Sequence, residues 1–211
     1  MSTLRTITGF KERLAGGGTR PNLFEVSIPT FPTNLGITWG QEEARTLNFL
    51  CKAAAIPGST VNPIDVPFRG RSFKVSGDRT IAPWTITVIN DEDFKLHNAF
   101  LQWQNGINKL ENATGATSPS AYMVNAYVDQ LGRGADVGRF STRNSSTGGA
   151  VGNVSIRPLR RFKLFDIWPS DVGEIALSYE QDNTIEEFSV EFQVQYMTAG
   201  EDGDQSGLII R

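Results

Sequence analysis

Hydrophobic and polar positions along this chain follow two periods, and the change between them is sharpest near residue 90. Over residues 84–89 the side chains alternate between two faces, which predicts a strand that buries Trp84, Ile86 and Val88. Beyond residue 90 the apolar spacing becomes four, three and four, which predicts a helix. Its apolar positions are Leu96, Phe100, Trp103 and Ile107. The asparagine and three acids at residues 90–93 are expected to cap the start of this helix.

Alternation of the same kind predicts further strands at residues 22–28, 47–53, 122–131, 156–168, 174–180 and 188–196. In the strand 174–180 the expected buried row is Ile175, Leu177 and Tyr179. The strand 156–168 is expected to place Ile167 on the same face as Phe165, and residues 169–173 are expected to form a turn. The apolar spacing over residues 3–14 predicts a short amphipathic helix. The sequence therefore favours a mainly β fold, an antiparallel barrel or sandwich with one packed α-helix and a short N-terminal helix.

The last predicted strand has one wholly polar face. Its polar row is Ser189, Glu191, Gln193 and Gln195, and its apolar row is Phe188, Val190, Phe192, Val194 and Tyr196. A strand with such a face is expected to have water or a polar surface beyond it.

Glycine and proline divide the chain into parts. Residues 1–19 form an N-terminal helix or arm that ends at three consecutive glycines, and residues 20–197 form the main β-barrel domain. Within that domain, residues 56–79 are expected to form a long loop with one short strand near residue 74, because three prolines disfavour a central strand. Residues 132–153 form a Gly/Ser/Arg-rich surface insertion, and residues 198–211 form an acidic C-terminal tail.

Composition excludes several kinds of function. The 211 residues carry a formal net charge of −3, one cysteine and one histidine, so neither an internal disulfide nor a multi-cysteine metal site is available. No run of apolar residues reaches the ~18 that a membrane helix needs, and no signal peptide is recognisable. Cys51 is expected to be a small buried hydrophobe and His97 an ordinary packed helix residue. We expect no enzyme activity, no metal and no cofactor.

Basic residues are concentrated between residues 133 and 163. Those proposed to form a basic outer surface are Arg139, Arg143, Arg160 and Arg161. Such a set fits a solvated strand face beside a polar loop, a contact surface for an acidic protein partner, or a site for duplex DNA. The protein contact is favoured over DNA because base-stacking aromatic residues are not interleaved with the cluster.

Several segments, taken in order, resemble one known family. They are Arg20-Pro-Asn-Leu-Phe-Glu-Val, Cys51-Lys-Ala-Ala-Ala-Ile-Pro-Gly, Ser76-Gly-Asp-Arg-Thr, Trp84-Thr-Ile-Thr-Val-Ile-Asn-Asp-Glu, Phe100-Leu-Gln-Trp-Gln and Trp168-Pro-Ser-Asp-Val-Gly-Glu-Ile-Ala-Leu. Together they are similar to the tail tube proteins of contractile-tailed bacteriophages and cover most of residues 20–131 and 154–197. The insertion at 132–152 and the acidic tail depart from the family pattern.

The resemblance implies a structural subunit of a virion tail, made in the host cytoplasm. Six copies would form a ring with a continuous inner β-barrel, and the rings would stack into a tube inside a contractile sheath. Further implied partners are the baseplate or initiator protein, the terminator protein, the tape-measure protein and double-stranded DNA in transit. No membrane contact is implied.

On this reading, some residues are expected to line the lumen and others to join subunits or rings. The lumen candidates are Ser189, Glu191, Gln193 and Gln195, on a wall that is acidic or neutral so that DNA is not held. The interface candidates are Leu4, Ile7, Arg20, Pro57, Pro63, Phe68, Gly77, Asp78 and Arg79. The alternatives are the tube subunit of a type VI-like or extracellular contractile secretion system and a monomeric ligand-binding β-barrel.

Overall fold

A curled antiparallel sheet forms the centre of the molecule. The structure is a computed structural model that describes residues 7–14, 18–37, 39–132, 140–141, 155–156, 158–180, 183–200 and 209–210. Six strands follow one another in the order β1-β6-β9-β10-β5-β2, and every neighbouring pair is antiparallel. They are β1 (Phe24–Ser27), β2 (Cys51–Ala54), β5 (Trp84–Ile89), β6 (Val124–Gln130), β9 (Arg160–Val172) and β10 (Glu187–Gln193). β1 also lies near β2 without pairing with it, so the two ends of this strand order approach each other, and we call the six-stranded unit the barrel. The predicted mainly β, antiparallel fold is confirmed.

Short elements surround this barrel. They are α1 (Ile7–Arg13), the 3-10 turns η2 (Thr33–Leu35) and η3 (Pro119–Ala121), the strand pair β7 (Phe140–Ser141) and β8 (Ser155–Ile156), and the strands β11 (Tyr196–Gly200) and β12 (Ile209–Ile210). β11 pairs with β9 on one side and with β12 on the other. The first residues assigned to the acidic tail, 198–200, therefore belong to a strand of the main sheet.

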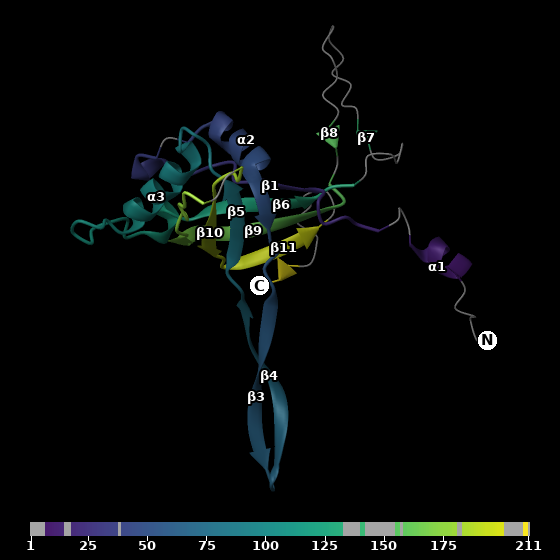
Figure 1. Ribbon diagram of the computed structural model, residues 1–211. Coiled ribbons are helices and arrows are strands. Elements are labelled where there is room, and N and C mark those ends of the chain that lie inside the picture. Colours follow the sequence, from purple (N-terminus) through teal and green to yellow (C-terminus); the bar gives the residue numbers. More distant parts are fainter. Residues whose placement is uncertain are drawn as a thin grey trace.

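The unit that is clearest in the sequence supplies much of the core. Trp84, Ile86 and Val88 of β5 are buried, as the alternation predicts. The helix α3 (Lys95–Ile107) buries Leu96, Phe100 and Trp103 against the barrel, also as predicted (Figure 1). The expected cap is wrong: the residue before the helix is Phe94, with φ 52°, and no side chain caps the helix.

Residues 41–50 form a helix, α2 (Gln41–Leu50), where the sequence predicted a loop followed by a strand. The prediction grouped Leu47 with Phe49 on one strand face, but Leu47 is buried and Phe49 is exposed. The run Gln-Glu-Glu-Ala-Arg consists of good helix formers. The Glu43 carboxylate also accepts a hydrogen bond from the Gly40 backbone N–H at 2.7 Å, which stabilises the helix start.

One residue of β9 changes which side chains face the core. Asp166 has φ 53°, and its N–H donates to the Asn125 side-chain oxygen at 3.3 Å. The irregularity allows β9 to pair first with β6 and β11 and then with β10. Leu164 and Ile167 are consequently both buried, so the predicted face of Ile167 is wrong. The predicted turn at 169–173 is also wrong, because β9 continues through Val172.

Two further strand predictions fail after β9. Residues 174–180 form no strand, and the expected buried side chains of Leu177 and Tyr179 are exposed. The predicted strand 188–196 is interrupted at residues 194–195, after which the buried positions shift to Met197 and Ala199. The alternation of apolar and polar residues in the sequence does not reveal where the buried face of a strand shifts in this way.

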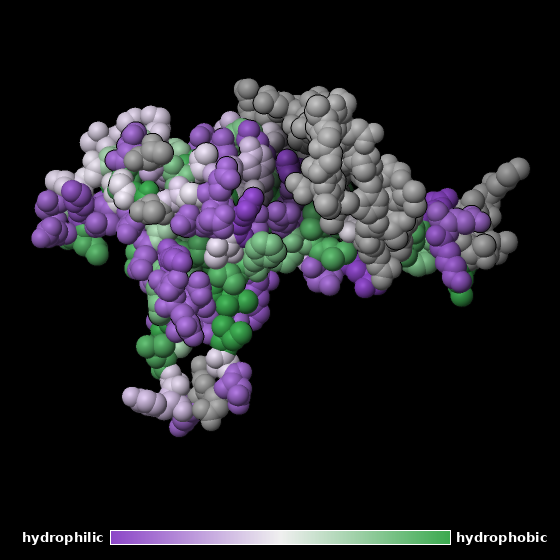
Figure 2. Space-filling view, turned by 90° about the horizontal axis from the view of Figure 1, so that it is seen from above, coloured by the Kyte–Doolittle hydropathy of each residue, from purple (hydrophilic) through white to green (hydrophobic). Residues whose placement is uncertain are grey.

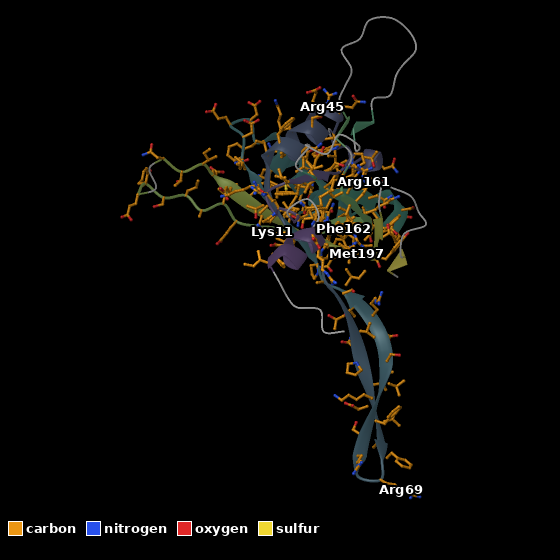
Figure 3. The ribbon with its side chains drawn as sticks, turned by 90° about the vertical axis from the view of Figure 1, so that its right-hand side faces the viewer. Lys11, Arg45, Arg69, Arg161, Phe162 and Met197 are labelled. Atoms are coloured by element: carbon orange, nitrogen blue, oxygen red, sulfur yellow. The ribbon has the colours of Figure 1, made fainter. Side chains whose placement is uncertain are left out.

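The predicted loop at 56–79 is a long β-hairpin. Its strands are β3 (Ser59–Phe68) and β4 (Arg71–Ile81), which pair along their whole length with one irregularity. Prolines are tolerated because a two-stranded ribbon leaves one edge of each strand unpaired. The hairpin extends far from the barrel (Figures 1 and 3).

Candidate assembly surfaces

The tip of the β3–β4 hairpin (residues 59–81) is a tight turn of two residues. Arg69 and Gly70 both have positive φ, 45° and 81°, which is the geometry of a two-residue hairpin turn that matches the strand twist. The register pairs Phe68 with Arg71, and Figure 3 shows Arg69 at the far end of the hairpin. This turn therefore fixes which side chains share each face of the hairpin.

One face of the hairpin is mostly apolar in the half that lies nearer the tip. Residues paired across the strands lie on the same face, and alternate pairs lie on opposite faces. The apolar face carries Ile64, Val66, Phe68, Phe73 and Val75, with Arg71 at its tip, and the opposite face carries Pro63, Asp65, Pro67, Ser72, Lys74 and Ser76. Phe68 and Phe73 are 66% and 67% exposed, and the three aliphatic residues are exposed as well. In one subunit this apolar face is thus left open to solvent.

The interface candidates at the base of the hairpin differ in their surroundings. Pro57 is buried within its own subunit, whereas Asp78 and Arg79 are exposed. Gly77 lies at the irregularity of β4, where an added Cβ would come within 2.7 Å of the Asn62 carbonyl oxygen. The glycine is therefore required by the hairpin itself.

The N-terminal helix α1 also exposes apolar side chains. Ile7, Phe10 and Leu14 follow helical spacing and are all exposed, and Figure 1 shows α1 beside the barrel and separate from it. Arg20 is exposed, and its carbonyl oxygen accepts a hydrogen bond from the Gln130 side chain at 2.8 Å. The candidate Leu4 lies outside the described residues.

A third projecting segment connects β9 to β10. We call residues 173–186 the β9–β10 arm; of these, 181 and 182 lie outside the described residues. Leu177, Tyr179 and Ile185 are exposed along it. Figure 3 shows the arm extending away from the barrel, and Figure 2 shows hydrophobic atoms in the lower part of the picture, above pale and purple atoms at its edge.

The outer face of β10 and its neighbours is polar. Ser189 pairs with Thr87 and Glu191 pairs with Thr85, so these four side chains share one surface. The Ser170 hydroxyl of β9 lies 3.2 Å from the Glu191 carboxylate, to which it can donate, and the Gln193 amide donates to Ser170 at 3.3 Å. Three of the four lumen candidates therefore lie together.

The fourth lumen candidate, Gln195, lies in the interruption between β10 and β11. It is exposed, and its N–H donates to the Phe165 carbonyl at 3.2 Å. Near the other end of β10, Lys52 forms an ion pair with Glu187 at 2.5 Å. The polar face therefore contains the Lys52–Glu187 pair and two further acids, Glu191 and its cross-strand partner Asp171 on β9.

The outer face of β6, β9 and β11 has a different chemistry. The rings of Phe165 and Tyr196 stack with centroids 4.3 Å apart, and the Lys163 Nζ lies 4.3 Å from the Phe165 centroid and 5.7 Å from that of Tyr127. We call the surface formed by Tyr127, Lys163, Phe165 and Tyr196 the cation–aromatic face. The sequence showed the basic residues here but not two of their aromatic neighbours, Tyr127 and Tyr196, which lie on other strands.

The predicted basic outer surface is only partly described. Arg160 is exposed, whereas Arg161 is half-buried and binds Asp129 through Nε to Oδ1 at 2.7 Å and Nη2 to Oδ2 at 2.5 Å. Asp129 raises the pKa of the Arg161 guanidinium through these hydrogen bonds. Arg161 is therefore neutralised by its own chain. Arg139 and Arg143 lie outside the described residues.

The residues that most resemble catalytic groups are packed. Burial raises the pKa of the Cys51 thiol to about 12, so it stays protonated near neutral pH. The ring of His97 contacts that of Phe188 edge-on, with centroids 5.1 Å apart, and desolvation lowers its pKa while Glu186 opposes that effect. Among the described residues no group of three or more histidine, cysteine or acidic side chains could hold a metal ion. In the same part of the chain no helix is long and apolar enough to cross a membrane.

Comparison with known proteins gives a consistent result. Residues 19–199 match the family described as "Phage tail tube protein". The tail tube protein gp19 of Enterobacteria phage T4 is 30% identical over 182 residues, which cover 86% of this chain and 92% of that protein. The corresponding protein of Enterobacteria phage T6 is 31% identical over the same length.

Solved structures with a similar fold come from contractile assemblies. A chain in the baseplate of the anti-feeding prophage matches with a TM-score of 0.57 and 11% identity, covering 89% of this chain and 98% of that one. A chain in the sheath–tube complex of an extracellular contractile injection system, in its extended state, matches with a TM-score of 0.51 and 11% identity, covering 90% and 97%. At such low identity these matches show the fold alone.

Proposed function

This chain belongs to the phage tail tube protein family and is a structural subunit of a phage tail tube, and we propose that six copies close into a ring whose stacking builds that tube. The observation that carries the proposal is the apolar face of the β3–β4 hairpin. A soluble protein that remained monomeric would leave Phe68 and Phe73 in water, whereas stacked copies would cover them.

The hairpin is suited to bridge two rings. It contains ten residues in β3 and eleven in β4, so at about 3.3 Å per residue it reaches some 30 Å beyond the barrel. One face is apolar and the other polar, which lets it lie on a neighbouring ring with the polar face toward solvent. The exposed apolar side chains of α1 supply a second, smaller contact of the same kind.

We assign the polar outer face of β10 and β5 to the lumen. Ser189, Glu191 and Gln193 supply polar side chains without a free cation, since the amine of Lys52 is paired with Glu187. A conduit with such a wall does not hold DNA by counterion release, so the polyanion can pass. Gln195, which lies in the interruption after β10, would sit at the rim of this wall.

The remaining partners follow from the position of a tube inside a contractile tail. The sheath protein would surround the rings, the baseplate or initiator and terminator proteins would contact the two ends, and the tape-measure protein and double-stranded DNA would occupy the lumen. The relation to phage T4 at 30% identity favours a virion tail over a secretion apparatus. Fold similarity to injection-system chains does not distinguish the two.

Electron microscopy of the purified chain at high protein concentration tests ring formation. Six-fold rings and stacked tubes are expected, and a strictly monomeric species would contradict the proposal. The lumen assignment is tested with Glu191→Lys, which is expected to leave rings intact and to slow DNA delivery because it places six cations in the lumen.

Glu191→Gln is the matched control for that substitution. It removes the charge but retains the shape and can still bind Ser170, so delivery is expected to stay near the wild-type rate. Delivery at the wild-type rate by both variants would show that Glu191 does not line the lumen.

A further inference from the structure

The β9–β10 arm is acidic and carries its apolar side chains outward. Residues 173–186 contain Glu174, Glu180, Asp182 and Glu186 and no lysine or arginine. Leu177 is 82% exposed and Tyr179 is fully exposed, so the described part of the subunit does not cover either side chain. Tyrosine is enriched among the anchoring residues of protein interfaces.

The cation–aromatic face has the complementary chemistry. Phe165 and Tyr196 form a stacked pair, and Lys163 lies over the ring of Phe165. Within the described part of the chain Lys163 forms no ion pair, in contrast to Arg161, which is bound to Asp129. Lys163 is half-buried against these rings, so a carboxylate that reached it would pair in a partly dehydrated setting.

The positions of the two surfaces indicate that each one contacts another copy of this chain. The cation–aromatic face lies on the first half of β9 and the arm begins where β9 ends. From Lys163 to Val172 the strand advances nine residues, which corresponds to at most about 30 Å because β9 is irregular at Asp166. Two complementary surfaces at opposite ends of one strand favour a head-to-tail contact between copies, and a head-to-tail contact that closes generates a ring.

We propose that the β9–β10 arm of one subunit docks on the cation–aromatic face of a neighbouring copy in the ring. Tyr179 adds a third ring to the stack of Phe165 and Tyr196, and Glu180 pairs with Lys163. Leu177 covers the exposed edge of the same aromatic cluster. The proposal rests on the proposed ring and identifies the side-to-side contact within it, whereas the hairpin connects one ring to the next.

Disulfide trapping between full-length copies tests this contact. Ser178→Cys places a thiol on the arm beside Tyr179, and Thr198→Cys places one on the face, because Thr198 pairs with Lys163 in the β9–β11 ladder. The native Cys51 is buried and does not compete. Copies with tags of different size distinguish a heterodimer of these two variants from dimers of either one.

We expect mild oxidation to give about tenfold more heterodimer from this pair than from Ser178→Cys mixed with Lys109→Cys, because docking raises the local thiol concentration. Lys109 is an exposed lysine that follows α3 and serves as the control. Equal heterodimer yields from the two mixtures would overturn the proposal.

Charge exchange provides the second test. Glu180→Lys alone and Lys163→Glu alone are each expected to reduce heterodimer formation and ring assembly, and the two together are expected to restore both. Failure of the double variant to recover, with both single variants impaired and folded, would contradict the pairing of these residues. Rings of the wild-type chain are scored separately, so loss of this contact is distinguished from failure of the proposed ring.

Discussion

The barrel and the β3–β4 hairpin use the same strand pattern and differ in what covers it. In β5 the alternating residues Trp84, Ile86 and Val88 are fully buried, because α3 and the facing strands supply a second layer. In β3 the alternating residues Ile64, Val66 and Phe68 are exposed, because no other element in the described part of the chain covers them. The barrel core is covered within one subunit, and we propose that another subunit covers the hairpin.

Because of this difference, the apolar residues of the barrel stabilise the folded subunit, whereas those of the hairpin are expected to stabilise the association of subunits. Apolar area buried in the barrel contributes about 25 cal/mol per Å² to the folding of each subunit. A two-stranded hairpin is only marginally stable alone in water, so its register must be maintained by the tip turn and by its base, where the Ala82 N–H donates to the Gly58 carbonyl at 2.9 Å. Its apolar face contributes to association when a neighbour covers it.

The largest expected contrast comes from one substitution made in both regions. Phe100→Ala removes a fully buried ring from the barrel core and should lower the free energy of unfolding by about 3–5 kcal/mol. Phe73→Ala removes an exposed ring from the hairpin and should change it by less than about 0.5 kcal/mol. Urea unfolding followed by tryptophan fluorescence measures both. Similar losses from the two variants would mean that the hairpin face is covered within the subunit.

A smaller contrast is expected for two acids. Asp129→Asn weakens the two hydrogen bonds between the buried Asp129 carboxylate and the half-buried Arg161, and it should lower the free energy of unfolding by about 1–3 kcal/mol. Asp65→Asn changes an exposed carboxylate of the hairpin that accepts one hydrogen bond from Ser72, and it should leave that free energy unchanged within error. The same unfolding assay compares the two variants. An equal loss of stability in both would contradict the difference that we draw between the barrel and the hairpin.

The smallest expected effect is a pH dependence confined to the barrel. Burial lowers the pKa of His97 in the folded subunit, so the unfolded chain binds the proton more readily. The free energy of unfolding should therefore decline as the pH falls below about 6.5, the unfolded pKa of histidine. His97→Gln should remove this component of the decline, and the hairpin, which has no histidine, should not contribute to it. An unchanged pH profile in the variant would show that other groups cause the decline.

Sequence patterns predicted the barrel well where one face of an element meets the core. Alternation located β1, β5 and β6, and helical spacing located α3, because burial of one face imposes a regular period. The pattern failed at Asp166 and at residues 194–195, where a strand irregularity shifts the buried face. It also failed at α2, where local helix propensity outweighed an apparent alternation.

The assembly surfaces were harder to predict because they depend on more than one strand. The prolines of the hairpin suggested a loop, since the sequence does not reveal that both of its strands are edge strands. Lys163 was recognised only as part of a basic cluster, because its aromatic neighbours Tyr127 and Tyr196 come from other strands. The polar row of β10 was recognised directly because it lies on one strand.

Tube assembly by two matched hairpin variants tests most directly whether the uncovered face joins copies of this chain. The double substitution Phe68→Ser and Phe73→Ser changes the apolar face, and Asp65→Ser with Lys74→Ser changes the opposite face of the same hairpin. Electron microscopy should show no stacked tubes for the first variant and tubes of wild-type length for the second, with both subunits folded. Tubes of wild-type length from the first variant would contradict the account.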